Sequence, residues 1–271
     1  LYRHQIGNNV YTLELGLMDI SEEEVVNELV PIVESYLNET LEIVSLKDSM
    51  HHLGYTSLVL KHQQNYSLQY GFQQYALEPL NCGDSFSAFH QDNLHYLALS
   101  DGMGQGKMAA NESKLTLEVL SKLILNGIGL KDTIDSINAL LKIKNRNDMF
   151  TTLDLCNINL ANARMKLIKY GANPSYHIRS GMVEKIATNS LPVGVVSKLK
   201  MVSYEMPLKN NDLIIMSSDG TGNDFEQIVN DNVHLYCDQH PQEIATFLMD
   251  QVLEKNNLDD ISIIVIKVVN N

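Results

Sequence analysis

The sequence predicts an α+β fold in which two β-sheets are flanked by helices. Strands occur in runs and the helices lie between these runs, whereas strands that alternate with helices would indicate a parallel sheet. The chain has 271 residues, which suffices for one large domain or for a domain with a smaller unit. Residues 1–62 contain ten acidic residues and three Lys or Arg, a net charge of −7, and differ from the rest. We therefore expect a small α+β segment over residues 1–62 and a main domain over residues 63–271.

The N-terminal segment has the pattern of a strand, a helix and two further strands. Residues 10–17 read as a strand, and Ser21 and Glu24 form the capping box that starts a helix. Pro31 lies inside this helical pattern and should kink or interrupt it. The two following strands are expected at residues 41–46 and 55–62.

The main domain is richer in strands. Two helices are expected at residues 107–126 and 130–145, separated by glycines, and a third at 241–254, with Pro241 in its first turn. The strands expected from alternating or continuous apolar residues are 66–75, 85–89, 94–100, 150–160, 164–170, 175–178, 183–186, 200–206, 213–218 and 261–269.

Composition excludes several classes of partner. The net charge of −13 disfavours nucleic acid and anionic membrane surfaces, because both repel an acidic protein. Three widely spaced cysteines match no zinc motif or disulfide set, so we expect a reducing, cytoplasmic compartment. No apolar run approaches 18 residues. Because the chain starts at Leu1, we interpret it as a fragment whose full-length protein has room for a membrane anchor before it.

Acidic residues stand at the ends of several expected strands. Asp101 and Asp219 each follow an apolar strand within a Ser-Asp-Gly sequence, Asp259 and Asp260 precede the last strand, and Asp84 lies 17 positions before Asp101. One Asp-Gly alone is ordinarily a turn, but four such acidic strand ends favour a shared site. Carboxylates are the ligands preferred by Mg²⁺ and Mn²⁺, and two such cations can bind a phosphoryl group and activate a water.

The glycine-rich segment after Asp101 fits a cation better than a phosphate. Its spacing matches neither a Walker A sequence nor a dinucleotide fingerprint. Asp101 would repel a phosphate, whereas the carbonyl of Gly102 can approach a metal closely. The nine histidines form no zinc-binding motif, so structural roles are favoured for them.

The ordered set of motifs resembles the metal-dependent Ser/Thr phosphatases of the PPM family, and within them the bacterial branch that acts in sporulation. The resemblance covers residues 63–268 closely. It rests on Gly83-Asp84-Ser85-Phe86, Ser100-Asp101-Gly102-Met103-Gly104, Ser218-Asp219-Gly220 and Asp259-Asp260-Ile261-Ser262, supported by Asn111-Glu112-Ser113, Thr151-Thr152-Leu153-Asp154-Leu155, Gly171-Ala172-Asn173-Pro174-Ser175 and Asn189-Ser190-Leu191-Pro192-Val193-Gly194.

This resemblance implies a four-layer αββα sandwich with two Mn²⁺ or Mg²⁺ ions at one end. By motif, Asp101 would bridge both ions, Asp219 and Asp259 would join it on one, and Asp84 with the Gly102 carbonyl on the other. Asp260 matches a neighbouring position of the last motif. Two departures from the wider family are Met103, where many relatives have histidine, and the lack of an arginine shortly before Asp84.

The resemblance also implies a substrate and a mode of control. The substrate would be a phosphorylated STAS-domain anti-sigma-factor antagonist, whose dephosphorylation activates a sporulation sigma factor. Alternatives are a phosphatase of general stress signalling and a non-catalytic module that binds the same partner; the complete set of acids argues against the module. Residues 1–62 would be a regulatory segment that docks near helices 107–126 and 130–145 or forms a homodimer contact.

Overall fold

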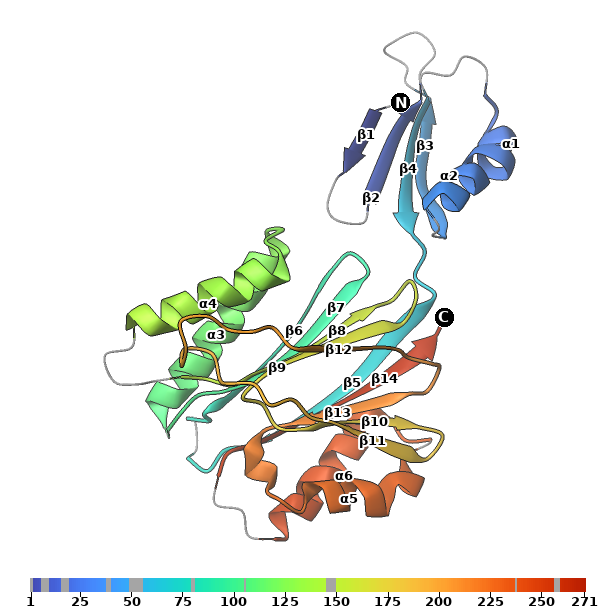
Figure 1. Cartoon of the computed structure of the whole chain (residues 1–271). Helices are drawn as coiled ribbons and strands as arrows, with labels where there is room; N and C mark the ends of the chain where they lie inside the picture. Colours follow the sequence, from blue (N-terminus) through green and yellow to red (C-terminus); the bar gives the residue numbers. More distant parts are fainter. Residues whose placement is uncertain are drawn as a thin grey trace.

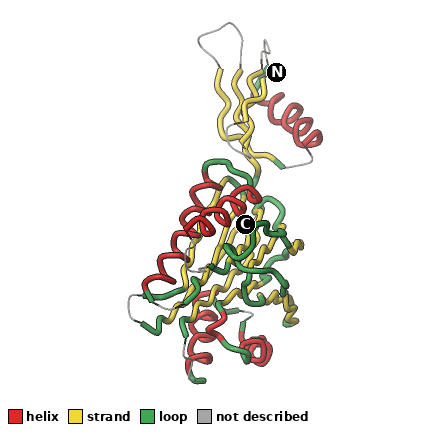
Figure 2. Tube along the Cα trace, turned by 60° about the vertical axis from the view of Figure 1, so that its left-hand side comes forward, coloured by secondary structure: helices red, strands yellow, loops and turns green. Residues whose placement is uncertain are grey.

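The computed structural model has two five-stranded antiparallel sheets packed face to face, with helices on both outer surfaces (Figures 1 and 2). This confirms the predicted αββα sandwich. The structure describes residues 2–5, 10–15, 20–37, 40–48, 56–78, 81–104, 106–144, 150–236, 238–255 and 259–271.

The first sheet has the strand order β11-β10-β13-β14-β5. Its last strand, β14, pairs along its whole length with β5, although the two are far apart in the sequence. The strands are β5 (Tyr66–Tyr75), β10 (Ser175–Arg179), β11 (Met182–Ile186), β13 (Leu213–Ser217) and β14 (Ile261–Asn270).

The second sheet has the order β12-β9-β8-β7-β6 and contains two hairpins, β6-β7 and β8-β9. The strand expected from residue 150 begins only at Leu153, because Thr151 forms isolated bridges with Gly102 and Val193 instead. The strands are β6 (Asp84–Gln91), β7 (Leu94–Asp101), β8 (Leu153–Asn159), β9 (Arg164–Tyr170) and β12 (Ser203–Pro207).

The central strands are buried on both faces, which explains their continuous apolar sequences. On β13, Ile214 and Met216 pack between the sheets, whereas Leu213 and Ile215 pack toward the outer helices. On β7, Leu97 and Leu99 face the other sheet. Alternate apolar residues of each central strand therefore pack against the other sheet and against the outer helices, and these two contacts stabilise the sandwich.

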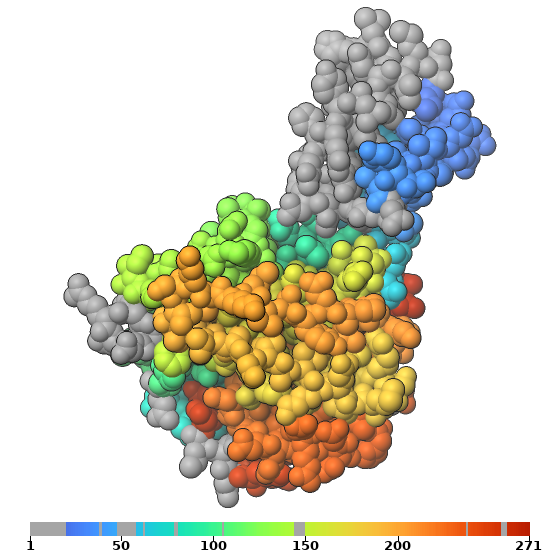
Figure 3. Space-filling model, viewed as in Figure 1, coloured from blue at the N-terminus to red at the C-terminus, as the bar shows by residue number. Residues whose placement is uncertain are grey.

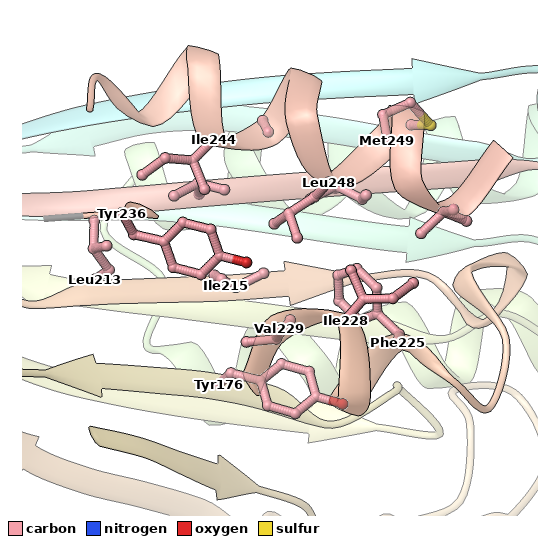
Figure 4. Close-up of a cluster of buried hydrophobic side chains, with 14 of the residues drawn as sticks. Tyr176, Leu213, Ile215, Phe225, Ile228, Val229, Tyr236, Ile244, Leu248 and Met249 are labelled. Carbon is pink, nitrogen blue, oxygen red and sulfur yellow. The ribbon is translucent and has the colours of Figure 1, made fainter. Parts of the chain in front are cut away.

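Each outer surface carries a pair of helices. Helices α3 (Lys107–Leu125) and α4 (Leu130–Lys144) cover the second sheet, and α5 (Phe225–Asn232) and α6 (Pro241–Leu253) cover the first, where they form the apolar cluster of Figure 4. The sequence did not predict α5, which is short and follows the 3₁₀ turn Asp219–Thr221; a second such turn spans Val233–Leu235.

The free edge of β5 is covered by a side chain of α6. Gln242 accepts a hydrogen bond from the Phe72 backbone N–H at 3.1 Å and donates one to the Phe72 carbonyl at 3.1 Å. The helix approaches this closely because residue 71 is glycine: a Cβ there would lie 2.3 Å from the Gln242 backbone nitrogen. Helix α6 is thus joined to the edge of the sheet as well as packed on its face.

The N-terminal residues form a separate four-stranded sheet with one helical segment. It extends beyond the end of the sandwich, where β4 leads into β5 (Figure 1), and its helical segment lies beyond the sandwich in the space-filling view (Figure 3). Its own small core consists of Val25, Val30, Leu41, Leu58 and Leu60. The elements are β1 (Tyr2–Gln5), β2 (Val10–Leu15), α1 (Glu22–Glu24), the π-helical turn Val25–Leu29, α2 (Val30–Leu37), β3 (Leu41–Asp48) and β4 (Thr56–His62).

The predicted capping box is confirmed, since Ser21 and Glu24 exchange backbone and side-chain hydrogen bonds. The helix does not end at Pro31; a π-helical turn precedes the proline, and helical structure continues to Leu37. Helical π-type turns are rare and occur mostly as single-turn bulges inside α-helices, as here before Pro31. Among the described helices, none is both long and apolar enough to cross a membrane. Several ends of expected elements lie outside the described residues: Gly16, Leu17, Tyr55 and Asn145.

Candidate active site

The chain segments that carry the predicted site acids meet at one end of the sandwich. Asp84 opens β6 and Asp101 closes β7, and the two are paired in the register of these neighbouring strands. Asp219 follows β13, and Asp259 and Asp260 precede β14; because these strands are antiparallel neighbours, the end of one meets the start of the other. Both sheets therefore present carboxylates at the same end.

Burial and mutual repulsion raise the pKa values of the central carboxyls. Burial raises the pKa of Asp101 to about 8, and the charges of Asp84, Asp219, Asp259 and Asp260 act in the same direction. Burial likewise raises the pKa of Asp84 to about 7, although hydrogen bonds to serines partly offset this. The pKa of Asp219 is raised by burial and by Asp259. Such raised values are typical of functional sites, and a bound cation would relieve the repulsion.

Asp84 is held at the junction between the two sheets. Its side chain is only 4% exposed and forms hydrogen bonds with Ser218 and Ser262 of the opposite sheet. Gln74 donates to both the Asp84 carbonyl and the Ser262 hydroxyl at 3.1 Å. The Asp84 Oδ2 atom is buried and has no hydrogen-bond partner in the part of the chain that the structure describes. A buried carboxylate oxygen without a partner is costly, which fits a position meant for a ligand.

Asp260 fixes the chain that leads into β6. Its two carboxylate oxygens accept hydrogen bonds from the backbone N–H groups of Leu77 at 2.8 Å and Gly83 at 2.6 Å. Asp259 is exposed and accepts a bond from the Asp260 N–H at 2.9 Å. Asp259 is therefore the freer of the two to reach a ligand, whereas Asp260 already orients the residue before Asp84.

The Gly102 backbone lies where a side chain could not fit. A Cβ on Gly102 would fall 2.0 Å from the Ala109 carbonyl oxygen in the first turn of α3. Its N–H donates to the Gly83 carbonyl at 3.1 Å, which ties the glycine-rich segment to the chain before Asp84. The helix α3, the Gly102 carbonyl and Asp84 are consequently parts of one close-packed unit.

The chemistry of these donors fits a hard divalent cation. Carboxylate and carbonyl oxygens are the preferred ligands of Mg²⁺ and Mn²⁺. Among the described residues, no three His, Cys, Asp or Glu side chains lie close enough to one another to hold a metal ion. The acids are near enough to shift each other's pKa values, but they do not close around one point.

Sequence reasoning assigned no role to the polar residues that support the acids. Thr152 accepts a hydrogen bond from the Asp101 N–H at 2.9 Å, and Thr151 donates to the Asp101 carbonyl at 2.7 Å. Ser218 accepts from the Ser262 N–H at 2.9 Å. Hydroxyl residues inside otherwise apolar strands were the available signal, because such groups need partners when buried.

Comparison with known proteins places this chain in one family. The family model of stage II sporulation protein E (SpoIIE) matches residues 91–269. The SpoIIE proteins of Bacillus subtilis (strain 168) and Priestia megaterium are both 30% identical to the chain over 97% of its length. The chain spans 34% of the first relative and 48% of the second, about a third and about a half of their lengths.

Solved structures agree with this assignment. The structure of the PP2C phosphatase domain with a fragment of the regulatory domain of SpoIIE from Bacillus subtilis matches with a TM-score of 0.83 and 27% identity, over 99% of this chain and 81% of that chain. The catalytic domain of the phosphatase PstP, solved with two manganese ions, shares the fold, with a TM-score of 0.61 and 20% identity over 76% of this chain and all of that chain. The chain therefore belongs to the SpoIIE family and has the fold of the PP2C-type protein phosphatases.

Proposed function

We propose that this chain is a metal-dependent protein Ser/Thr phosphatase. The observation that carries the proposal is the meeting of Asp84, Asp101 and Asp219 from both sheets at one end of a phosphatase-type sandwich, with pKa values raised by burial and by mutual repulsion. Membership of the SpoIIE family supports it.

Two Mn²⁺ or Mg²⁺ ions would be held by these acids. Asp101 would contribute to both ions, Asp219 and Asp259 to one, and Asp84 with the Gly102 carbonyl to the other. The bound cations would polarise the phosphoryl group and lower the pKa of a water. The protein's part is to hold the acids in place: Thr152 fixes the end of β7, and Asp260 fixes Gly83 next to Asp84.

The proposed substrate is a phosphoserine or phosphothreonine on a STAS-domain anti-sigma-factor antagonist. Beside Asp84, a groove of about 380 Å³ lies between β5, β6 and α3, and its lining includes Phe72, Phe86 and Lys114. The groove has room for a protein segment, and Lys114 contributes a cationic side chain to its lining in a molecule of net negative charge. Sporulation signalling is favoured over general stress signalling because both curated relatives are sporulation proteins.

An assay on a phosphorylated STAS-domain protein tests the activity. We expect release of phosphate with Mn²⁺ and none with EDTA, and Asp219→Ala should remove the release while Asp250→Ala, an exposed residue of α6, should not. Binding of the phosphoprotein without release of phosphate would instead support the non-catalytic module. Phosphate release that EDTA leaves unchanged would contradict the metal-dependent mechanism.

We further propose that residues 1–62 are a regulatory segment. Its sheet leads through residues 63–65 directly into β5, whose far end carries Gln74, the donor to Asp84. Deletion of residues 1–62 should change the Mn²⁺ concentration needed for half-maximal activity or the oligomeric state measured by light scattering. If both match the longer chain, the segment is a passive spacer.

A further inference from the structure

A buried ion pair lies inside the sandwich next to the candidate site. Asp154 of β8 and Lys169 of β9 are cross-strand partners, and the Lys169 Nζ atom is 2.5 Å from Asp154 Oδ2. Lys169 is 0% exposed and Asp154 is 1% exposed. Two charges removed from water are costly, and an apolar pair of similar volume would often serve stability as well or better. The pair therefore calls for another explanation than stability.

Lys169 also holds the connection between the two sheets. Its Nζ atom donates a second hydrogen bond to the Asn173 carbonyl at 2.6 Å, and the Asn173 side chain donates to the Ser218 carbonyl at 2.8 Å. Ser218 immediately precedes Asp219. A continuous set of contacts thus runs from the ion pair in the second sheet to the end of β13 in the first.

Asp154 of the pair borders the site acids. Its Oδ1 atom is buried and has no hydrogen-bond partner among the described residues. A small cavity of about 20 Å³ is lined by Asp154 together with Asp101, Asp219, Thr152 and Asn173. A cavity of this size has room for one water molecule. The pair is therefore adjacent to the acids as well as linked to them through Asn173.

We propose that Asp154 and Lys169 are a positioning pair, which sets the place of Asp219 relative to Asp101 through Asn173 and Ser218. The inference rests on the proposed function, since it assigns the pair a role in holding the metal-binding acids. Residues that orient ligands in this way typically change metal affinity by about ten- to a hundredfold when they are replaced.

Two variants separate positioning from packing. Asn173→Ala removes the link but leaves the ion pair, and the double replacement Asp154→Leu with Lys169→Met removes both charges while keeping apolar volume. We expect both variants to need about tenfold more Mn²⁺ for half-saturation, measured by calorimetry without substrate and by activity, with kcat at saturating Mn²⁺ largely retained. The thermal unfolding midpoint of the double variant should stay near that of the unchanged chain.

A matched control uses an ion pair away from the site. Asp212 is 2% exposed and pairs with Arg179, 2.6 Å away, and with His177. Asp212→Asn should lower the unfolding midpoint without changing the Mn²⁺ requirement. Wild-type Mn²⁺ affinity in both Asn173→Ala and the double variant would overturn the proposal.

Hydrogen exchange provides a readout that does not depend on metal or catalysis. The backbone N–H groups of residues 217–221 should exchange faster in Asn173→Ala than in the unchanged chain, and unchanged exchange would overturn the positioning role. If the unchanged chain binds no Mn²⁺, the proposed function fails, whereas the exchange rates still decide whether Asn173 holds this segment.

Discussion

Asp101→Asn is expected to lower phosphatase activity severely and, in the metal-free protein at pH 8, to raise thermal stability. Asp101 is the carboxyl on which all four neighbouring acids act, and burial raises its pKa to about 8. Asparagine keeps the shape but removes the charge, so it relieves the repulsion and at the same time weakens the hold on both proposed cations. The loss of activity should be about a thousandfold, equivalent to about 4 kcal/mol of transition-state stabilisation.

The measurements are kcat at saturating Mn²⁺ and the unfolding midpoint in EDTA at pH 8, with Asp250→Asn as the control for removal of an exposed charge. Opposite movements of the two quantities would distinguish a functional acid from a structural one. Turnover close to that of the unchanged chain would refute the assignment of Asp101, and a lowered midpoint would refute its repulsive environment.

Mn²⁺ is expected to stabilise the protein more at pH 8 than at pH 6. The folded-state pKa values of Asp84 and Asp101, about 7 and about 8, lie above that of an unfolded aspartate. Groups raised in this way contribute stability that is fully present below the unfolded pKa of about 4 and is lost progressively until the pH has risen through about 7 to 8. The metal-free chain should therefore be less stable at pH 8 than at pH 6, and a bound cation should offset this loss.

At lower pH the cation must instead displace protons from the same oxygens. Below the folded pKa values, each proton released weakens apparent affinity by about tenfold per pH unit. Calorimetry in two buffers of different ionisation enthalpy measures this proton release directly. An increase in unfolding midpoint with Mn²⁺ that is equal at pH 6 and pH 8 would show that these carboxyls do not bind the ion.

The layered fold was predictable because its central strands carry simple apolar patterns. Residues 96–100 and 213–218 are buried, and this is visible as nearly continuous hydrophobic sequence. Helix α5 was missed because its apolar contacts, including Phe225 and Ile228, span little more than one turn. Strand β1 was missed as well; it gains its place only by pairing with β2.

The sequence predicts the acids of the candidate site but not the residues that hold these acids in place. Asp84, Asp101 and Asp219 stand out because each lies at a strand end, and the structure brings them to one end of the sandwich; their metal-binding roles stay a prediction. Lys169 gives no such signal, because a lysine in a strand ordinarily reaches solvent, as the half-buried Lys166 of the same strand does. Its burial depends on Asp154 and Asn173, and neither is adjacent to it in the sequence.

The contact between Gln242 and Phe72 has a consequence for self-association. A ten-residue strand with a free edge can recruit a strand from another molecule, and growth of sheets in this way leads to aggregation. The Gln242 amide imitates a neighbouring peptide group, with one donor and one acceptor, and so occupies a place on the ladder of β5 that an incoming strand would need. Because Gln242 belongs to helix α6, no further strand can pair with it and extend the sheet. An incoming strand would therefore have to displace Gln242 before it could pair with β5 at Phe72.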